Sequence, residues 1–599
     1  MPCARSMLRL CSGVTIALIG ALTTTGAVAQ RRGAALRVEI TVPVTAHAAP
    51  ITGRAFVLIS RQSDPEPRFQ AARTGAPFFG RDIERLAPGK PAVIDTTDLG
   101  SPVESLADLP AGDYFVQAMV NVYSEFRRAD GHVVWMHDDQ WEGQNWRRSP
   151  GNLYSDVSRV HIDPTAGGVI RLSARNVVPA VQVPPDTKWV RRLKIESPLL
   201  TKFWGRPVYL GATVLLPRDF DTTTTQYPVH YVQGHFSLAP PLGFEEKGAF
   251  YDEWVKDDFP RMVVVTLQHP NPYFDDSYGV NSANVGPYGD ALMQELVPKV
   301  EESFRVIRQP YARTLSGGST GGWISLAHQL LYPDFYGGVW SYCPDSVTFS
   351  DVEGIDIYAD ANAFHKQIGW RQVFTANSRE ADGRIRMTSQ QRNYYELVSG
   401  TKGRSGEQLD IWSAVYGPVG KDGYFEPLFD KRSGVINPAV AQYWREHYDL
   451  LEHMKRNWST LGAAITGKIH VYTGDMDNFY LNNSTREMEL WMRSSTNPQY
   501  RGFFMYGDGR GHCFTGAPSQ TDRLLEIAEH VAKHAPAGTA TPWWSRQRPT
   551  ARHDSRQPPV LTFEPRAATL PRADGTWRAD ALNVGRGDGI VRERAPIRR

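Results

Sequence analysis

The sequence predicts an α/β domain with a mostly parallel sheet, preceded by an antiparallel β-sandwich. The second part of the chain alternates apolar runs such as "VYLGATVLLP", "YPVHYVQG" and "RMVVVTLQ" with helical patterns such as "ALMQELVPKVEESF", which is typical of strands joined by crossover helices. The first part has short alternating runs such as "ALRVEITV" and "GRAFVLIS" between Pro, Gly and Asp turns, as in a sandwich.

Length and composition favour a globular protein with two or three domains. A chain of 599 residues is too long for one ordinary core. Its hydrophobic share of 41% and charged share of 22% are ordinary for globular proteins. A net charge of +2 provides no bulk field to attract nucleic acid or an anionic membrane, so neither is an expected partner.

The N-terminus has the pattern of an export signal. Arg5 and Arg9 precede the apolar stretch "GVTIALIGAL", and the small residues "AVA" end at Ala29. We therefore expect residues 1–29 to be cleaved and the protein to be periplasmic or secreted. The apolar stretch is too short for a membrane span, so stable membrane insertion is not expected.

The predicted boundaries follow changes in the hydrophobic period. We expect the β-sandwich over residues 35–183, a linker at "AVQVPPDTKWV", and the α/β domain over 188–535 with an insertion over 344–458. The insertion contains the helical pattern "NPAVAQYWREHYDLLEHMKRNW", which Asn437 can cap, and a helical lid over an active site is a common use of so long an insertion. Residues 536–599 turn to Pro, Arg, Gly and Asp, which favours a flexible tail.

The segment Gly317-Gly318-Ser319-Thr320-Gly321 fits the pattern G-x-S-x-G, whose small residues allow a sharp strand-to-helix turn with the serine at its tip. The pattern alone is weak, but "RTLSGG" has the character of a strand and "GWISLAHQLLY" has helical spacing. Ser319 is therefore the predicted nucleophile. The helix N-terminus would then point at the reacting centre.

A serine nucleophile needs a general base and an acid that orients the base, and in this kind of fold the acid precedes the histidine. "KIHVYTGDMD" places Asp475 and Asp477 after a strand, and "FFMYGDGRGHCF" places His512 after another. His512 is the predicted base. Asp477 is the favoured acid because two residues separate it from Gly474, and Asp475 is the alternative, which can instead cap the turn.

The oxyanion of acyl transfer needs amide donors that are in place before the reaction. The backbone N–H of Thr320 is one candidate because it directly follows the nucleophile. The second should come from the loop after an early strand, where "YPVHYVQGHF" places the amides of His235 and Phe236. We expect the side chain of His235 to be structural or to line the substrate site.

Several of these stretches together resemble one known family. "GGSTGGW", "DSYGVNSANVGPYGDALMQELVPKVEESFRV", "SYCPDSVTF" and "GHCF" are similar to the "putative esterase" family of α/β-hydrolases, relatives of esterase D, feruloyl esterases, enterochelin esterases and mycolyltransferases. The resemblance covers residues 188–533 and implies Ser319, Asp477 and His512 as the triad of a serine ester hydrolase that needs no cofactor. Relatives often have HGG where this chain has "QGHF", which leaves open which amide completes the oxyanion hole.

Cys343 and Cys513 remain once the signal, with Cys3 and Cys11, is removed. Two cysteines in an oxidising compartment suggest one disulfide, and two buried free thiols are the alternative. Within the resemblance, Cys343 follows the strand after the nucleophile helix and Cys513 adjoins His512. This placement predicts a Cys343–Cys513 disulfide that holds the histidine loop.

The stretch "HPNPYFDDSYGVNSANVGPYGDA" lies after another strand, at the edge where α/β folds bind ligands. Four of its residues are candidates to line the substrate site, with packing of the loop as the alternative: Tyr278, Asn281, Asn284 and Tyr288. Trp323, four residues after the nucleophile, either faces the pocket or packs beneath the lid.

These observations predict an exported serine esterase with an acyl-enzyme intermediate. An exported peptidase or an acyltransferase would use the same triad, and an inactive hydrolase whose sandwich binds carbohydrate is an alternative of another class. Ester substrates are the expected partners, among them acylated carbohydrates and phenolic esters. The sequence has no H-E-x-x-H, no paired C-x-x-C and no phosphate-binding Gly-rich loop with Lys, so no metal or cofactor is expected.

Overall fold

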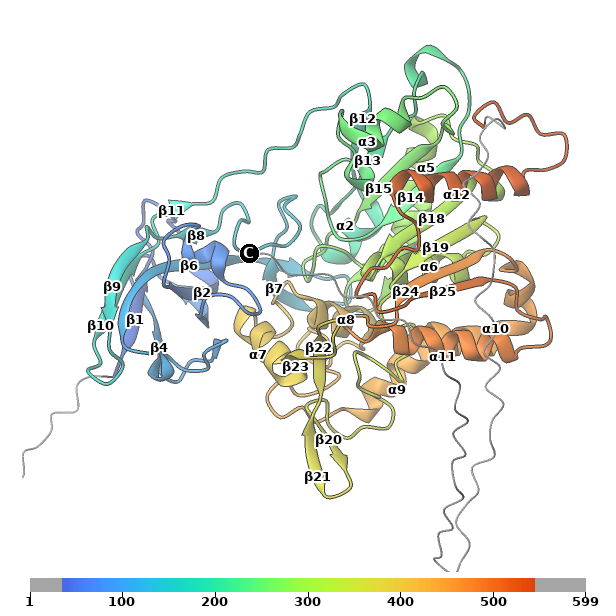
Figure 1. Ribbon diagram of the computed structural model, residues 1–599. Coiled ribbons are helices and arrows are strands. Elements are labelled where there is room, and N and C mark those ends of the chain that lie inside the picture. The colour runs from blue at the N-terminus through green and yellow to red at the C-terminus, as the bar shows by residue number, and fades with distance from the viewer. Residues whose placement is uncertain (1–34, 545–599) are drawn as a thin grey trace, which may run out of the picture. The chain divides into compact units, whose positions relative to one another are not determined.

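The computed structural model describes residues 35–544, and Figure 1 shows their arrangement. The predicted signal, residues 1–29, and most of the predicted tail lie outside the described residues. The ordered chain continues past the predicted tail boundary at residue 535, because Trp543 is 1% exposed and its carbonyl accepts from Arg261 N at 2.8 Å. Across residues 35–544, no helix is both long enough and apolar enough to cross a membrane.

The second part of the chain forms an eight-stranded sheet in the order β12-β13-β15-β14-β18-β19-β24-β25. The strands β12, β13 and β15 pair antiparallel, and the neighbours from β15 to β25 pair in parallel. The mostly parallel sheet is therefore confirmed. Its strands are β12 (Val190–Glu196), β13 (Tyr209–Leu215), β14 (Val229–Gln233), β15 (Val263–Gln268), β18 (Arg313–Gly318), β19 (Gly338–Tyr342), β24 (Ile469–Gly474) and β25 (Phe503–Gly507).

Helices cover both faces of this sheet, as they do in parallel sheets generally. Alternate residues of β19 point to opposite faces. Val339 lies in the core that includes α6 (Thr320–Leu331), whereas Trp340 packs with Ile527 of α12 (Gln520–His534). Because both faces are covered, a site can form only at the ends of the strands.

The first part of the chain is β-rich. It forms a three-stranded sheet, β10-β1-β4, and a larger sheet with the path β11-β8-β6-β2-β3-β5, to which β7 and β9 add by pairing with β6. One apolar core takes side chains from both sheets. Its strands are β1 (Arg37–Thr41), β2 (Ile51–Ser60), β3 (Phe78–Leu86), β4 (Pro91–Asp95), β5 (Gly100–Ser101), β6 (Gly112–Arg127), β7 (Val133–His137), β8 (Leu153–Tyr154), β9 (Ser158–Ile162), β10 (Val169–Ser173) and β11 (Asn176–Val177).

One strand pair departs from the predicted antiparallel pattern, because β1 and β10 pair in parallel. These strands lie at the two ends of the region, so no tight hairpin fixes their direction. The two parts of the chain also share a core. Phe126, Val134 and Met136, on β6 and β7, belong to the core of the second part, and the Phe126 ring packs edge-on against Trp204 with centroids 5.4 Å apart.

The chain between β19 and β24 forms two hairpins and a group of helices. These are β20 (His365–Ile368) with β21 (Arg371–Phe374), β22 (Ala376–Arg379) with β23 (Ile385–Thr388), α7 (Ser389–Ser399), α8 (Gln408–Tyr416), α9 (Pro438–His447) and α10 (Leu450–Ala464). The prediction of one helix after Asn437 is wrong. Asn437 caps α9 through Ala439 N at 3.1 Å, but Asp449 starts a second helix by accepting from Glu452 N at 2.8 Å, since aspartate favours the N-cap position.

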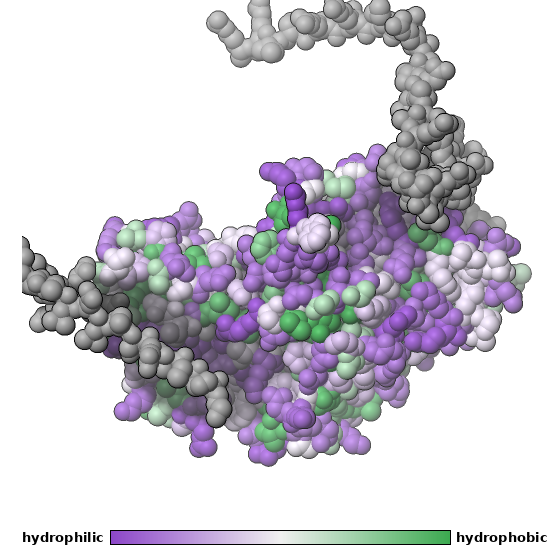
Figure 2. All heavy atoms as spheres, turned by 90° about the horizontal axis from the view of Figure 1, so that it is seen from below, coloured by the Kyte–Doolittle hydropathy of each residue, from purple (hydrophilic) through white to green (hydrophobic). Residues whose placement is uncertain are grey.

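The surface of the insertion is mixed in character. The β20–β21 hairpin extends away from the central sheet (Figure 1) and exposes Ile368, Trp370 and Phe374. Figure 2 shows a mainly hydrophilic face with separate small apolar areas, which is ordinary for a folded protein surface.

Candidate active site

Ser319 stands at the junction of β18 and α6. Its backbone angles, φ 56° and ψ −121°, are rare for a residue other than glycine and mark a strained turn. Its N–H donates to Tyr342 O at 3.0 Å. A Cβ on Gly317 would overlap with Gly321 O, and one on Gly321 would overlap with Gln233 O. The two outer glycines of the pattern are thus required by close backbone packing.

The two loops after β24 and β25 bring Asp477 and His512 together. Asp477 Oδ2 lies 2.8 Å from His512 Nδ1, and Asp477 Oδ1 accepts from Phe479 N at 2.9 Å. The Asp477 side chain is 0% exposed and that of His512 is 21% exposed. Asp475, the alternative acid, instead accepts from Gly509 N at 2.8 Å. Because His512 Nδ1 faces a carboxylate, Nε2 is the nitrogen left for proton transfer.

Cys343 and Cys513 form the predicted disulfide, with Cα atoms 5.0 Å apart. It joins the residue after β19 to the residue after His512. A ring nitrogen of His512 lies within 4.8 Å of both sulfur atoms, and Cys513 Sγ would be 3.3 Å from a Cβ on Gly318. The disulfide therefore places the histidine loop against the turn that bears Ser319.

The Ser319 hydroxyl donates to Asp345 Oδ1 at 3.1 Å. A hydroxyl has one proton, so Ser319 must rotate away from Asp345 before it can donate to His512. Catalytic hydrogen bonds are often incomplete without substrate. In this structure the Ser319 hydroxyl is therefore bonded to Asp345 and not to His512.

Asp345 was not singled out from the sequence. It is 4% exposed, and its Oδ2 accepts from Tyr278 OH at 2.6 Å, Thr320 Oγ1 at 3.2 Å and Gln408 Nε2 at 3.0 Å. Burial raises the pKa of the Asp345 carboxyl, although the hydrogen bonds from Tyr278 and Ser319 act in the opposite direction. A sequence feature that could have indicated Asp345 is its position just after a strand of the eight-stranded sheet.

The end of β14 lies beside the first turn of α6, because a Cβ on Gly321 would be 3.0 Å from Gly234 Cα. This packing brings the segment of His235 and Phe236 to the N-terminus of the nucleophile helix, where Thr320 begins α6. The Phe236 ring itself packs edge-on against another ring, that of Trp141 in the first part of the chain, at 5.1 Å. Only the backbone amide of Phe236 can therefore donate a hydrogen bond to an oxyanion.

The side chain of His235 forms ion pairs. Its Nδ1 lies 3.0 Å from Asp275 Oδ1 and 3.1 Å from Asp276 Oδ2. Partial removal from water lowers the pKa of His235, but the two carboxylates outweigh this and raise the pKa well above its ordinary value. The three groups lie within 4.8 Å of one another and include metal-ligand types, but a protonated imidazole between two carboxylates accounts for their arrangement.

The five residues predicted to line a substrate site differ in their roles. Tyr278 reaches Asp345 as described above. Tyr288 and Asn284 are buried and donate to backbone carbonyls at 2.6 and 2.7 Å, which holds the loop in shape. Asn281 is exposed. Trp323 is 1% exposed and packs edge-on against Tyr278 at 5.5 Å. Of the five, the structure brings Tyr278 to the polar cluster around Ser319.

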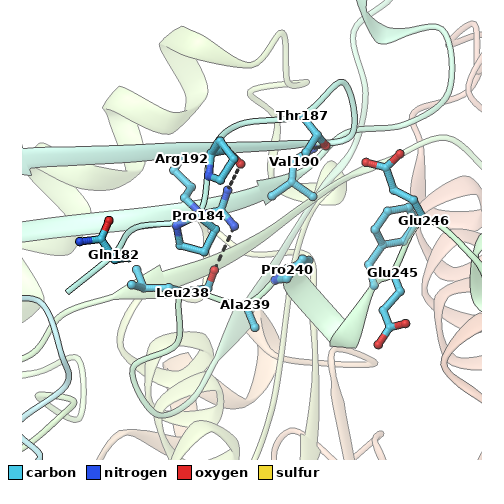
Figure 3. A pocket seen from close by; sticks show the side chains of 12 residues that line it. Gln182, Pro184, Thr187, Val190, Arg192, Leu238, Ala239, Pro240, Glu245 and Glu246 are labelled. Atoms are coloured by element: carbon cyan, nitrogen blue, oxygen red, sulfur yellow. Dashed lines mark hydrogen bonds between the residues drawn. The ribbon is translucent and has the colours of Figure 1, made fainter. Parts of the chain in front are cut away.

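Two cavities differ in their relation to these residues. A small one of about 10 Å³ is lined by Asp345 and by the aromatic residues Phe349, Trp412, Tyr416 and Trp444. A larger one of about 550 Å³ lies between the linker and the loop after β14, and Figure 3 shows its lining residues. None of the predicted site residues lines the larger cavity, so this cavity is not part of the candidate active site.

Residues 209–407 match the model of the family described as "Putative esterase". The chain therefore contains an esterase-family domain. The chain is also similar to a curated protein, the "Uncharacterized protein YbbA" of Bacillus subtilis (strain 168), with 27% identity over 139 residues, 22% of this chain and 54% of that protein. The chain thus spans about half the length of this relative.

Solved structures similar to this chain include a ferulic acid esterase, with 15% identity, a TM-score of 0.33, and coverage of 57% of this chain and 97% of that chain. An S-formylglutathione hydrolase from Agrobacterium tumefaciens has 13% identity, a TM-score of 0.33, and coverage of 58% and 98%.

Proposed function

We propose that the protein is an exported serine ester hydrolase with Ser319 as nucleophile, His512 as general base and Asp477 as the acid that orients it. The observation that supports this most is the 2.8 Å contact between Asp477 Oδ2 and His512 Nδ1, next to a serine on a strained strand-to-helix turn. This constellation is recognised by geometry and roles rather than by position in the sequence.

In the proposed reaction Ser319 rotates from Asp345 to His512, whose Nε2 takes the hydroxyl proton. Ser319 Oγ attacks the ester carbonyl, and backbone amides stabilise the oxyanion, with Thr320 N as one donor and His235 N or Phe236 N as the other. His512 then protonates the departing alcohol, which leaves an acyl-enzyme. Water, deprotonated by His512, releases the acid.

Three further proposals concern the rest of the chain. Helix α8 of the insertion acts as part of a lid, which is supported by Gln408 Nε2 donating to Asp345 Oδ2 at 3.0 Å. Export is supported by the Arg5–Ala29 signal pattern and by the Cys343–Cys513 disulfide, since disulfides persist in oxidising compartments. The two sheets around one core support a β-sandwich in the first part of the chain.

The test is hydrolysis of p-nitrophenyl esters of increasing acyl length by the mature protein, together with labelling by a fluorophosphonate. Ser319→Ala should abolish labelling and reduce kcat by about 10⁶-fold. A folded wild-type protein with neither turnover nor labelling would refute the proposed function.

A further inference from the structure

Asp345 is a buried carboxylate beside the nucleophile, and among residues 35–544 none of its direct hydrogen-bond partners carries a positive charge. Its direct partners are the hydroxyls of Ser319, Tyr278 and Thr320 and the amide of Gln408. Buried carboxylates are usually paired with a cation or a metal ion. Asp345 lacks such a partner in direct contact.

The proposed reaction leaves Asp345 less well satisfied. The donor to Oδ1 is Ser319, and this donor is lost when Ser319 turns to His512. A buried carboxylate oxygen without a donor is costly. Its negative charge would also face the oxyanion that develops nearby. A cation on the substrate would correct both problems, because it would replace the lost donor and lie between two negative charges.

The surroundings of Asp345 favour a small cation. Phe349, Tyr416 and Trp444 pack mutually with ring centroids 5.1 Å apart, and with Trp412 they line the cavity of about 10 Å³ that Asp345 also lines. This volume holds about one water molecule. Aromatic faces beside a carboxylate attract ammonium groups.

Glu353 is a second buried carboxyl group near Asp345. It is 8% exposed, and its hydrogen-bond partner is the Asn377 amide. Burial, followed by the negative charge of Asp345, raises the pKa of the Glu353 carboxyl well above its ordinary value. The negative charge of Asp345 thus acts on Glu353 and favours its neutral form.

We propose that Asp345 is a specificity-determining residue that binds the ammonium group of the substrate, and that the preferred substrates are esters of small α-amino acids. This inference rests on the ester hydrolase activity proposed above. Before the hydroxyl turns, Asp345 Oδ1 is 3.1 Å from Ser319 Oγ. Ser319 Cβ stays in place during the turn, so the attacked carbonyl carbon, which must lie about 3–3.5 Å from Oγ, remains near Asp345. The group that reaches Asp345 is therefore attached to the carbon next to the carbonyl.

Three methyl esters with the same carbon skeleton test the inference at pH 7: those of L-alanine, lactic acid and propionic acid, which place an ammonium, a hydroxyl or a hydrogen on that carbon. The wild type should hydrolyse the alanine ester with a kcat/KM at least about 100-fold above the propionate ester. Asp345→Asn should reduce this ratio of kcat/KM between the alanine and propionate esters to less than about tenfold, because a neutral side chain cannot pair with a cation.

Glu302→Gln is the matched control, since it removes one carboxylate charge from an exposed side chain that pairs with Lys299, and it should leave the preference unchanged. A preference for the propionate ester, equal turnover of the alanine and lactate esters, or a preference that survives in Asp345→Asn would each overturn the inference. If Asp345→Asn does not fold, the ranking of the three methyl esters by kcat/KM in the wild type still tests the inference. Absence of both turnover and labelling in the wild type would instead reject the proposed function.

Discussion

Asp345 and Asp477 hold matching positions in the fold and have different surroundings. Their strands, β19 and β24, are parallel neighbours that end at Tyr342 and Gly474, so each aspartate is about one turn beyond its strand at the same edge of the sheet. Asp345 is 4% exposed and Asp477 is 0% exposed. Asp477 faces an imidazole, whereas Asp345 faces hydroxyls and an amide.

The difference shows that burial at a strand end does not determine what a carboxylate does. A carboxylate next to an imidazole can orient the base and stabilise its protonated form. One that contacts only neutral donors keeps a negative charge without compensation, which suits the binding of a cation. Substitutions of the two residues should therefore have different effects. Replacement of Asp477 should reduce turnover, whereas replacement of Asp345 should increase stability.

The largest expected effect comes from Asp477→Asn. If the asparagine keeps its oxygen toward Phe479 N, its NH2 group faces His512 Nδ1 and cannot accept a hydrogen bond from it. The imidazole then adopts the wrong tautomer, and kcat should fall by about 10⁴-fold. Asp475→Asn should change kcat by less than about tenfold, because Asp475 serves the turn through Gly509 N. The reverse ranking, measured with a p-nitrophenyl ester, would make Asp475 the triad acid.

Removal of the disulfide tests whether the Asp345 loop and the His512 loop depend on each other. Cys343 lies between β19 and Asp345, and Cys513 adjoins His512, so the bond joins these two loops across 170 residues of chain. The variant with Cys343→Ala and Cys513→Ala should lose about 2–5 kcal/mol of unfolding free energy in urea. Its kcat should fall much less than that of Asp477→Asn, since the contact between Asp477 and His512 does not include either cysteine. An unchanged urea midpoint would show that the loops are held independently.

Tyr278→Phe tests the contacts around Asp345, because it removes one of the hydroxyls that donate to this carboxylate. Tyr278 OH donates to Asp345 Oδ2 at 2.6 Å and accepts from Trp412 Nε1, so its loss leaves a buried indole N–H without an acceptor. The unfolding free energy should fall by about 2 kcal/mol. In a double-mutant cycle with Asp345→Asn, the two changes should not be additive, because the residues are in contact. Additivity within about 0.3 kcal/mol would contradict the contact.

The sequence was sufficient for those features that depend on neighbours along the chain. The sharp turn at Ser319 is indicated by glycines that are its near neighbours in the sequence. The strands of the eight-stranded sheet are indicated by continuous apolar runs. The pairing of Cys343 with Cys513 was also confirmed, because both cysteines flank predicted strand ends. The triad residues remain predictions whose geometry agrees with the proposed roles.

Features that depend on distant parts of the chain were not predicted. The cluster around Asp345 joins Tyr278 and Gln408, which come from opposite sides of it in the sequence. No local pattern indicates that these three side chains meet. Likewise, the alternation in β7 predicts a strand but not that Val134 and Met136 enter the core of the second part. In both cases tertiary packing decides what the local pattern leaves open.

The smallest expected effect is a gain in the free energy of unfolding. Asp345→Asn keeps the shape of the side chain, and its oxygen can still accept from Tyr278, Thr320 and Gln408 while its amide donates to Ser319 Oγ. The variant removes a buried charge and should raise the unfolding free energy at pH 7 by about 1 kcal/mol.

The pH dependence of this gain identifies its cause. Burial raises the pKa of Asp345 in the folded state, so the folded wild type takes up a proton at a higher pH than the unfolded chain, and its stability increases as the pH falls through that range. The advantage of Asp345→Asn should therefore be full at neutral pH and should shrink as the pH falls toward about 3.9, the ordinary pKa of aspartate. Urea unfolding of both proteins at pH 7 and pH 5 measures the difference. If the gain instead grew on acidification, the folded state would favour the charged form of Asp345, and the contrast with Asp477 would no longer hold.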